Sequence, residues 1–321
     1  MAVFAPSPIL SVTVEHGTGG AEIHLHAAGQ GFWVARMAAR LGADVRLCAP
    51  LGGETGEVLK SLLTVDGITL LSVEVEGANG AYLHDRREGG REEIAMTPSP
   101  ELRRHELDDL YGVTLTAGIE AGATLLTGPR HEGILQADTY ERLSRDLKSN
   151  GRFVLADLSG ECLEAALRGG VDLIKVSAEE LIERGWLRSG EINGVMGAAR
   201  RLAEEGAANV VISRGALGAV AKVDDQLLEV SGPRFTSLDE HGAGDSMFAG
   251  VGVALGNGLP IEDALRVGIA AGALNVTRHG LGTGHPDEIS SLAAQVRVSP
   301  LQDDQSGRDS AAEGSAASTA S

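Results

Sequence analysis

The chain is poor in several kinds of residue, and each shortage excludes a class of protein. Only two of the 321 residues are cysteine, and Cys48 and Cys162 lie in separate apolar segments, so the sequence predicts neither a disulfide nor a metal-binding pair. No apolar run approaches the roughly 18 residues that a membrane-spanning helix needs. The first residues also lack a basic segment followed by an apolar one. We therefore expect a soluble, cytoplasmic protein without a membrane partner.

Positive charge is also scarce. There are 27 Lys and Arg residues against 45 Asp and Glu residues, which gives a formal net charge of −18, and this acidity argues against a nucleic-acid backbone or an anionic membrane surface as a partner. It does not exclude a small anionic substrate, since a local basic patch suffices to bind one. With 43% hydrophobic residues, the chain can bury a large core, either as one extended α/β domain or as two domains.

Short apolar strands alternate with amphipathic helices from about residue 28 onward, which predicts a mostly parallel sheet covered by helices. A helix over 137–149 precedes the strand Phe153–Asp157, and a helix over 191–205 precedes the strand Asn209–Ser213. Asp157 ends its strand at the edge where open α/β sheets bind ligands. The sequence therefore predicts a binding site along that edge.

Two early stretches, 9–26 and 69–97, alternate in polarity without long helices, so we predict that they form a small β-strand lid across the sheet edge. A lid of this kind excludes water from a reacting phosphate. Residues 299–321 are rich in Ser, Ala, Asp, Gln and Gly, which predicts a disordered polar tail that catalysis does not need. The predicted domain therefore spans residues 1–298.

The most informative local pattern is Gly242-Ala243-Gly244-Asp245, which precedes an apolar helix predicted over 246–255. Small residues leave the backbone N–H groups of a helix N-terminus accessible, and such a terminus binds phosphate. Asp245 could then deprotonate a hydroxyl group. The alternative is a tight turn in which Asp245 only interacts with the helix dipole. The apolar helix favours a functional carboxylate, because a carboxylate at the head of a buried helix is costly unless it is hydrogen-bonded or functional.

A second glycine-rich segment is Val210–Gly218, an apolar strand that runs into a loop. This loop could close over the phosphates of a nucleotide, but a simple hairpin turn would have the same pattern. Lys175 closes the apolar strand Val171–Lys175. Its ammonium group either approaches nucleotide phosphates or extends into solvent.

These segments resemble the PfkB family of ribokinase-like sugar kinases, whose C-terminal signature Asp-x-x-Gly-Ala-Gly-Asp-Ser/Thr matches residues Asp239 to Ser246. Met247 and the pair Ala249-Gly250 are most similar to the branch that contains 1-phosphofructokinase and tagatose-6-phosphate kinase. Further segments follow the family's order between residues 3 and 297, namely Gly29-Gln-Gly31 with Val34-Ala-Arg36, Leu51–Gly56, Thr127-Gly128, Asp157–Glu161, Ile174–Leu181 and Ser213–Gly218.

The resemblance implies a three-layer α/β/α domain with a mostly parallel central sheet and a β-strand lid, and Mg²⁺-dependent transfer of phosphate from ATP to a sugar hydroxyl. It implies Asp245 as the general base and Gly242, Ala243 and Gly244 as the anion hole. Glu180 matches the glutamate of the family's Asn-x-x-Glu motif and would contact Mg²⁺ indirectly. The implied nucleotide-binding residues are Ser177, which replaces the asparagine of that motif, Ser213, Arg214, Gly215, Ala216, Leu217, Gly218 and Gly244. Lid pairing in related kinases implies a homodimer.

The acceptor end departs from the family pattern. Its implied positions are Ser11, Gly29, Gln30, Gly31, Trp33 and Asp245. The family's aspartate, lysine and asparagine are replaced there by Ser11, Gln30 and Trp33. Since a neutral amide cannot supply the charge of the missing lysine, binding of a phosphosugar should weaken by roughly tenfold or more.

Three functional hypotheses follow. The first is a 1-phosphofructokinase-like kinase that acts on a sugar or sugar phosphate. The second, motivated by the three replacements, is a kinase of an unphosphorylated sugar, polyol or nucleoside. The third is a weakly active or non-catalytic binding protein, which the retention of Asp245 and its glycines disfavours.

Other residues near the predicted acceptor end allow two interpretations each. Trp33 recurs at helical spacing with Met37, Ala38 and Leu41, so it either stacks on the acceptor or packs the first helix. Arg130 follows Thr127-Gly128 and is a candidate replacement for the missing lysine. His24 and His26 alternate on a lid strand, where a solvated face explains them better than a metal site because no third ligand is evident.

Overall fold

We describe the fold from a computed structural model that covers the whole chain, and the description applies to residues 1–235, 241–277 and 282–301. The main sheet has ten strands. In spatial order they are β14 (Arg297–Pro300), β13 (Gln226–Ser231), β12 (Ala219–Val223), β11 (Ala207–Ser213), β10 (Val171–Ser177), β9 (Phe153–Asp157), β8 (Ala123–Thr127), β1 (Ala2–Phe4), β4 (Val45–Leu51) and β5 (Ile68–Glu74). Neighbouring strands from β5 to β11 are parallel, whereas β12, β13 and β14 add to the edge in antiparallel fashion.

Helices cover both faces of this sheet, and the alternation of side chains along the central strands divides the core in two. In β1, Val3 belongs to one buried cluster whereas Ala2 and Phe4 belong to the other. The first cluster is covered by α1 (Gln30–Arg40), α2 (Gly53–Leu63), α8 (Ala243–Gly256), α9 (Ile261–Asn275) and α10 (Pro286–Ala293). The second is covered by α3 (Arg104–Ala121), α4 (Asp138–Ser149), α5 (Gly160–Gly169), α6 (Ala178–Glu183) and α7 (Ile192–Glu204). The predicted three-layer α/β/α arrangement is confirmed.

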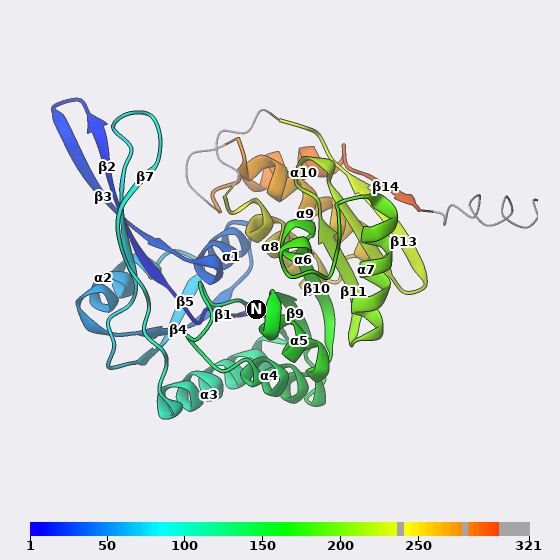
Figure 1. Cartoon of the computed structure of the whole chain (residues 1–321), viewed down its shortest axis with the longest axis horizontal. Coiled ribbons are helices and arrows are strands. Elements are labelled where there is room, and N and C mark those ends of the chain that lie inside the picture. The colour runs from blue at the N-terminus through cyan, green and yellow to red at the C-terminus, as the bar shows by residue number, and fades with distance from the viewer. Residues whose placement is uncertain (236–240, 278–281, 302–321) are drawn as a thin grey trace, which may run out of the picture.

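A second sheet forms the lid. Its four strands follow the order β3 (Gly20–Ala28), β2 (Ile9–Gly17), β6 (Ala81–Asp85) and β7 (Glu92–Thr97), and it projects from the body of the molecule (Figure 1). The second lid segment was predicted over 69–97, but β5 at its start pairs with β4 and closes the main sheet. Period-two alternation is common to any strand with one buried face, so it could not separate β5 from the lid strands.

Hydrogen bonds of one buried asparagine side chain join the lid to the body of the protein. The Asn79 side chain is 4% exposed and accepts a hydrogen bond from the Gly52 N–H at 2.9 Å. It donates to the carbonyl of Pro50 at 3.0 Å and, more weakly, to that of Pro8 at 3.4 Å. These bonds fix the lid strands β2 and β6 to the end of β4, so the lid base is rigidly placed beside the sheet edge.

Two findings concern what the described residues lack. In residues 1–235, 241–277 and 282–301, no helix has the length and apolar character that crossing a membrane requires. The same part of the chain contains no cluster of His, Cys, Asp and Glu side chains arranged to hold a metal ion. A disordered tail was predicted over 299–321, but Ser299 and Pro300 belong to β14 and pair with β13. The rest of the predicted tail beyond Leu301 lies outside the described residues.

Candidate active site

The head of α8 forms the centre of the site. Gly242 adopts the left-handed conformation (φ 70°, ψ 4°) just before Ala243, and the first intrahelical bond runs from the Ser246 N–H to the Gly242 carbonyl. The N–H groups of Ala243, Gly244 and Asp245 therefore have no partner within the helix, and no side chain caps it. The helix begins at Ala243 rather than at the predicted Ser246, which places Asp245 in its first turn, beside these free donors.

Polar contacts and close packing hold this helix head in place. The Ser246 hydroxyl donates to the Asn275 side-chain oxygen at 3.1 Å, and the Asn275 amide donates to the His241 carbonyl at 2.8 Å. A methyl group at Gly272 would approach the Ala243 carbonyl to 2.9 Å, so α9 packs directly against the turn. Asn275 is 1% exposed and is a positioning residue that the sequence pattern did not identify. Asp239, the first residue of the recognised signature, lies outside the described residues.

An ion pair lies beside Gly244, at the carboxyl ends of two neighbouring strands. Asp157 ends β9 and is aligned with Lys175 of β10. The Lys175 ammonium donates to both carboxylate oxygens of Asp157, at 3.0 and 3.1 Å, and the two side chains are 7% and 2% exposed. A methyl group at Gly244 would come within 2.7 Å of the Lys175 nitrogen. Lys175 therefore points inward, toward the helix head, rather than into solvent.

In this cluster the carboxylates of Asp157, Glu180 and Asp245 act on a single ammonium group, that of Lys175. Asp245 is half-buried, and loss of hydration, followed by the negative charge of Asp157, raises its pKa to about 7, although Lys175 opposes this change. Burial likewise raises the pKa of Asp157 to about 6, against the effect of Lys175. Burial lowers the pKa of Lys175, but the surrounding carboxylates outweigh it and the net direction is upward. Lys175 is therefore charged at neutral pH, whereas Asp245 titrates there.

Gln30 connects the first helix to this cluster. Its side-chain oxygen accepts a hydrogen bond from the Gly128 N–H at 2.7 Å, its amide donates weakly to the Asp157 carbonyl at 3.4 Å, and its hydrogen bond to Asp245 lowers the pKa of that carboxyl group. A methyl group at neighbouring Gly31 would overlap the Ala5 side chain at 2.3 Å. The predicted acceptor residue Gln30 thus lies beside the predicted base.

The other predicted acceptor positions lie where the lid meets α1. Gly29 precedes α1 with φ 108°, a conformation that favours glycine. Trp33 is half-buried and packs against Ile9, Ala28 and Tyr82 at the lid base. Ser11 is buried at 7% exposure. In β2, it occupies the same face of the lid sheet as Thr13.

The lid also brings in residues that the sequence pattern did not identify. His84 is 6% exposed, and its Nδ1 atom has no hydrogen-bond partner. Burial and the nearby charges of Arg91, Arg86 and Arg130 lower its pKa, while Glu93 opposes this. The Arg130 backbone N–H donates to the Ser7 hydroxyl at 2.8 Å. A group of cations therefore surrounds the lid face that carries Ser11 and His84.

Apart from Gly244 at the head of α8, the predicted nucleotide residues lie at or just after the ends of two neighbouring strands. Ser177 and Ser213 are aligned partners on β10 and β11. After Ser213, the chain forms a short 3₁₀ turn over Gly215–Leu217, and the Arg214 N–H donates to the Gly218 carbonyl at 2.8 Å. Gly218 has φ 81°, and a methyl group there would meet the Val230 carbonyl at 2.1 Å. The segment is thus a tight connection to β12 that exposes Gly215, Ala216 and Leu217.

Ser177 and Glu180 are engaged with each other at the start of α6. The Glu180 carboxylate accepts from the backbone N–H and the hydroxyl of Ser177, at 2.8 and 2.7 Å, and the Ser177 hydroxyl accepts from the Glu180 N–H at 3.1 Å. This reciprocal capping box stabilises the helix start. The Glu180 charge nevertheless acts on Asp157, Lys175 and Asp245, so it belongs to the same electrostatic cluster.

Comparisons with known proteins give relatives over almost the whole chain. The model of the pfkB family carbohydrate kinases matches residues 10–288. ATP-dependent 6-phosphofructokinase isozyme 2 of Escherichia coli is 30% identical over 84% of this chain and 87% of its own length. The 1-phosphofructokinase of Vibrio cholerae is 27% identical over 86% of this chain and 87% of its own. A crystal structure of phosphofructokinase-2 from Escherichia coli in complex with potassium superposes with a TM-score of 0.81 at 26% identity, and the match covers 92% of this chain and 98% of that one. The predicted ribokinase-like fold is confirmed.

Proposed function

The chain belongs to the pfkB family of carbohydrate kinases, and on that basis we propose that it phosphorylates a hydroxyl group of a sugar or sugar phosphate in the manner of a 1-phosphofructokinase. Kinases of this family use ATP. In the proposed reaction the acceptor oxygen forms a bond to the γ-phosphorus of ATP, the bond from that phosphorus to the β-phosphate breaks, and ADP leaves. The hydroxyl proton passes to Asp245.

The observation that carries this proposal is the position of Asp245 beside the free amides of α8. A general base works best when its pKa lies near the operating pH, and the pKa of Asp245 is raised to about 7. The N–H groups of Ala243, Gly244 and Asp245 follow the left-handed Gly242 and point out of the helix start. They would donate to the equatorial oxygens of the transferring phosphoryl group.

Lys175 has a supporting role in the same proposal. Its ammonium lies against Gly244 and is bound to Asp157, so it is fixed beside the anion hole before any substrate arrives. A preorganised cation stabilises the charge that develops on a transferring phosphoryl group. Gln30, which contacts Asp245, would hold that carboxylate in the orientation needed to accept a proton.

The nucleotide would be held at the ends of β10 and β11. Ser213, Arg214, Gly215, Ala216, Leu217 and Gly218 form the proposed nucleotide loop, and Ser177 and Gly244 would contact the phosphates. Mg²⁺ would neutralise the phosphate oxygens when bound. In such sites Mg²⁺ is held by the substrate phosphates, water and only one or two carboxylates, which agrees with the absence of a cluster of three such ligands among the described residues. Because the Glu180 carboxylate already accepts two hydrogen bonds from Ser177, it would contact the ion through water.

Cations on the lid face favour a phosphorylated acceptor. Gln30 cannot replace the family's lysine as a charge, but Arg130 and Arg91 act on His84, which shares the lid with Ser11. These arginines could bind a phosphate dianion where Gln30 cannot. Gly29, Gln30, Gly31 and Trp33 would form the floor of that acceptor site. The neutral Gln30 and Ser11 are the observations that favour the second candidate, a kinase of an unphosphorylated sugar, polyol or nucleoside.

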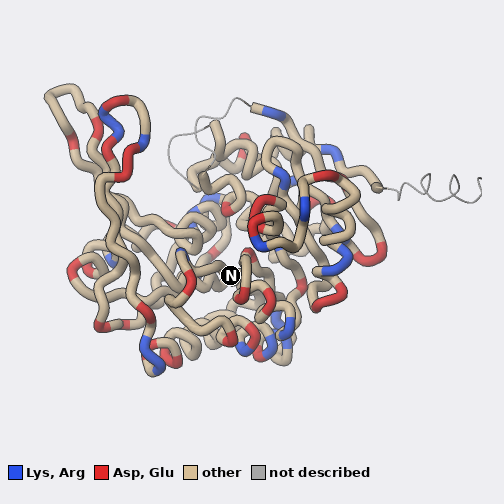
Figure 2. Tube along the Cα trace, viewed as in Figure 1, with Lys and Arg blue, Asp and Glu red and all other residues tan. Residues whose placement is uncertain are grey.

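The lid also supports the proposal of a homodimer. The register of the lid sheet aligns Leu25 with Val12, Val12 with Leu83, and Ile23 with Val14 on one face, and Ile23 and Leu25 are 70% and 48% exposed. The β2–β3 hairpin carries little charge, whereas charged residues gather in the β6–β7 loop (Figure 2). An exposed apolar face of this kind is typical of a protein interface, and a second copy of the lid would match it in shape and polarity.

An acceptor screen tests the proposed activity. Purified protein with ATP and Mg²⁺ would be assayed for ADP release against fructose 1-phosphate, tagatose 6-phosphate, free hexoses, ribose and nucleosides. We expect turnover with a phosphorylated sugar and an Arg130→Gln variant with a raised KM for it. Turnover only with unphosphorylated acceptors would support the second candidate, and no turnover despite ATP binding would contradict a kinase function.

A further inference from the structure

A cavity of about 540 Å³ lies between the lid edge and the outer surface of α1 and α2. Its walls come from β3, α1 and the segment from α2 to β5, and they include none of the predicted catalytic or nucleotide residues. Arg36 lies six positions after Gln30 on α1, which corresponds to about 9 Å along a helix axis. The cavity is therefore separate from the cluster around Asp245 but shares α1 with it.

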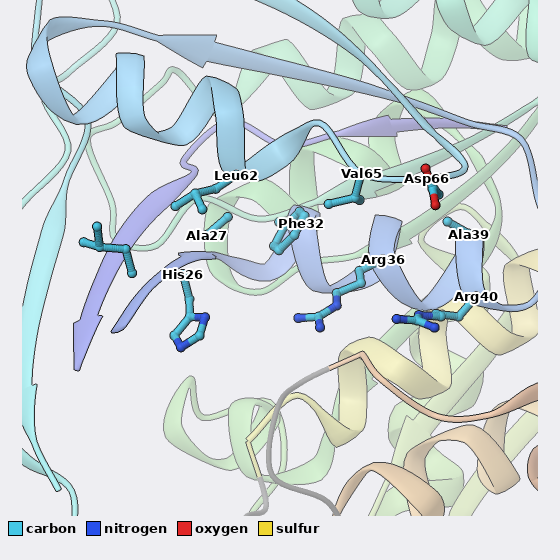
Figure 3. A pocket seen from close by; sticks show the side chains of 10 residues that line it. His26, Ala27, Phe32, Arg36, Ala39, Arg40, Leu62, Val65 and Asp66 are labelled. Carbon is cyan, nitrogen blue, oxygen red and sulfur yellow. The ribbon is translucent and has the colours of Figure 1, made fainter. Parts of the chain in front are cut away.

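One side of this cavity is cationic. Arg36 and Arg40 are one helical turn apart on α1, and Figure 3 shows both guanidinium groups extending along the cavity toward His26 of β3. Like charges four residues apart on a helix repel each other. Burial, followed by the charge of Arg40, lowers the pKa of Arg36, and among the residues that the structure describes no carboxylate opposes this change. The pair is thus a local concentration of positive charge in a chain whose net charge is −18.

The two guanidinium groups also have no anionic partner among the described residues. Within residues 1–235, 241–277 and 282–301, neither Arg36 nor Arg40 forms an ion pair or donates a hydrogen bond. Asp66, the one carboxylate in the wall, lies on the opposite side in Figure 3, next to Val65. Arg36 is half-buried and Arg40 is exposed. A half-buried arginine usually pairs with an anion, because the planar guanidinium is suited to bind carboxylates and phosphates through two parallel bonds.

The opposite side of the cavity is apolar. Phe32 is 5% exposed at its floor, and Leu62 and Val65 of the α2 end face it. The volume lies within the range of sites that enclose one small organic ligand. A ligand that fits both walls must carry a negative group for the arginines and an apolar group for Phe32 and Leu62.

We propose that this cavity is a second binding site, which takes a small amphipathic anion: a carboxylate or phosphate attached to an aliphatic or aromatic group. The anionic group lies between Arg36 and Arg40, and the apolar group contacts Phe32, Leu62 and Val65. Inorganic phosphate alone satisfies only the arginines and binds weakly. The site goes beyond the proposed kinase function and does not depend on it, since its readout is binding alone.

The first test is a fluorescence titration of the whole protein with the aromatic sulfonate 1-anilinonaphthalene-8-sulfonate. Dye bound to other apolar surfaces of the protein does not depend on Arg36 and Arg40, so the arginine-dependent component is the readout. We expect Arg36→Gln/Arg40→Gln to weaken that component by about tenfold or more, because each guanidinium supplies a charge-assisted contact. The control Arg188→Gln/Arg297→Gln removes the same charge from exposed positions outside the cavity and should bind as the wild type does. Equal affinity in both double variants would overturn the site.

A second pair of variants keeps both arginines. Val65 and Val58 are similarly exposed, at 39% and 37%, but only Val65 lines the cavity. Val65→Glu places a carboxylate opposite the arginines and should weaken dye binding by about tenfold, whereas Val58→Glu should leave it unchanged. Equal effects of the two substitutions would contradict the assignment.

Competition then defines the ligand class. We expect octanoate and octyl phosphate to displace the dye at concentrations where inorganic phosphate and octanol do not. Stronger displacement by one of the two octyl anions identifies the preferred head group. Displacement by inorganic phosphate as effective as by octyl phosphate would overturn the amphipathic site, as would displacement by octanol.

Discussion

At the scale of single residues, the active-site cluster combines one fixed ammonium with several carboxylates. Lys175 is held by two bonds from its ammonium to Asp157, whereas Asp245 forms no ion pair with any cation in the part of the chain that the structure describes. Burial raises the pKa of both carboxyl groups, to about 6 for Asp157 and to about 7 for Asp245, so Asp245 is the one whose charge changes closest to neutral pH. A pKa near the operating pH suits a reaction in which Asp245 must gain a proton.

The raised pKa of Asp245 predicts a measurable cost in stability. The unfolded carboxyl group has a pKa of 3.8 and the folded one a pKa of about 7. Between these pH values the unfolded chain has lost a proton that the folded protein retains, so rising pH favours unfolding until both forms are ionised. Asp245→Asn cannot ionise, and we expect its gain in unfolding free energy over the wild type to be about 1–3 kcal/mol larger at pH 8 than at pH 5.

Urea unfolding at the two pH values measures this difference. Asp225→Asn is the matched control, since Asp225 is exposed in the turn between β12 and β13, and it should show no such pH dependence. A variant at position 245 that is destabilised more at pH 8 than at pH 5 would mean that the ionised form of Asp245 stabilises the fold.

Some residue roles could be predicted from sequence and others could not. Asp245 could be proposed as the base from sequence because its glycine-rich neighbourhood is contiguous in the chain. The ion pair of Lys175 with Asp157 could not be predicted, because it depends on the register of two parallel strands. Asn275 carries no local pattern at all, although its side chain binds both the His241 carbonyl and the Gly282 N–H. Contacts between distant segments are fixed only by the tertiary fold.

At the scale of elements, helices with strong periodicity were predicted close to their observed bounds. The helix predicted over 137–149 is α4, Asp138–Ser149, and the one predicted over 191–205 is α7, Ile192–Glu204. β5 was misplaced because an edge strand of the main sheet and a lid strand show the same alternation. The Ser177–Glu180 capping box shows that a motif residue can also serve a local helix start.

The lid sheet makes a prediction at this scale. If its apolar face pairs with a second copy, Ile23→Glu/Leu25→Glu should convert a dimer to a monomer, because burying each such side chain contributes roughly 1.5–3 kcal/mol and a symmetric interface loses it twice. Sedimentation equilibrium measures the mass directly. Leu259→Glu is the control, since Leu259 is 39% exposed between α8 and α9, and it should leave the mass unchanged. A monomeric wild-type protein would contradict the proposed interface.

At the scale of the whole molecule, the site lies where several independent parts meet. The carboxyl ends of β9, β10 and β11, the head of α8, the start of α1 and the lid base contribute its residues. Parallel strands bring their carboxyl ends to one edge, which is why the sequence predicts a site at that edge. The cavity beside Arg36 and Arg40 could not be predicted from the sequence, because it lies where α1, the end of α2 and the lid edge meet.

The central claim is that the protein transfers phosphate from ATP to a carbohydrate hydroxyl with Asp245 as the base. The most direct measurement is the steady-state rate of transfer of radiolabelled γ-phosphate to the best acceptor, for the wild type and for Asp245→Asn. We expect labelled sugar from the wild type, a loss of roughly 10²–10⁴ in kcat for the variant, and ATP affinity within a few-fold of the wild type. Labelled product formed at the wild-type rate by Asp245→Asn would contradict the claim.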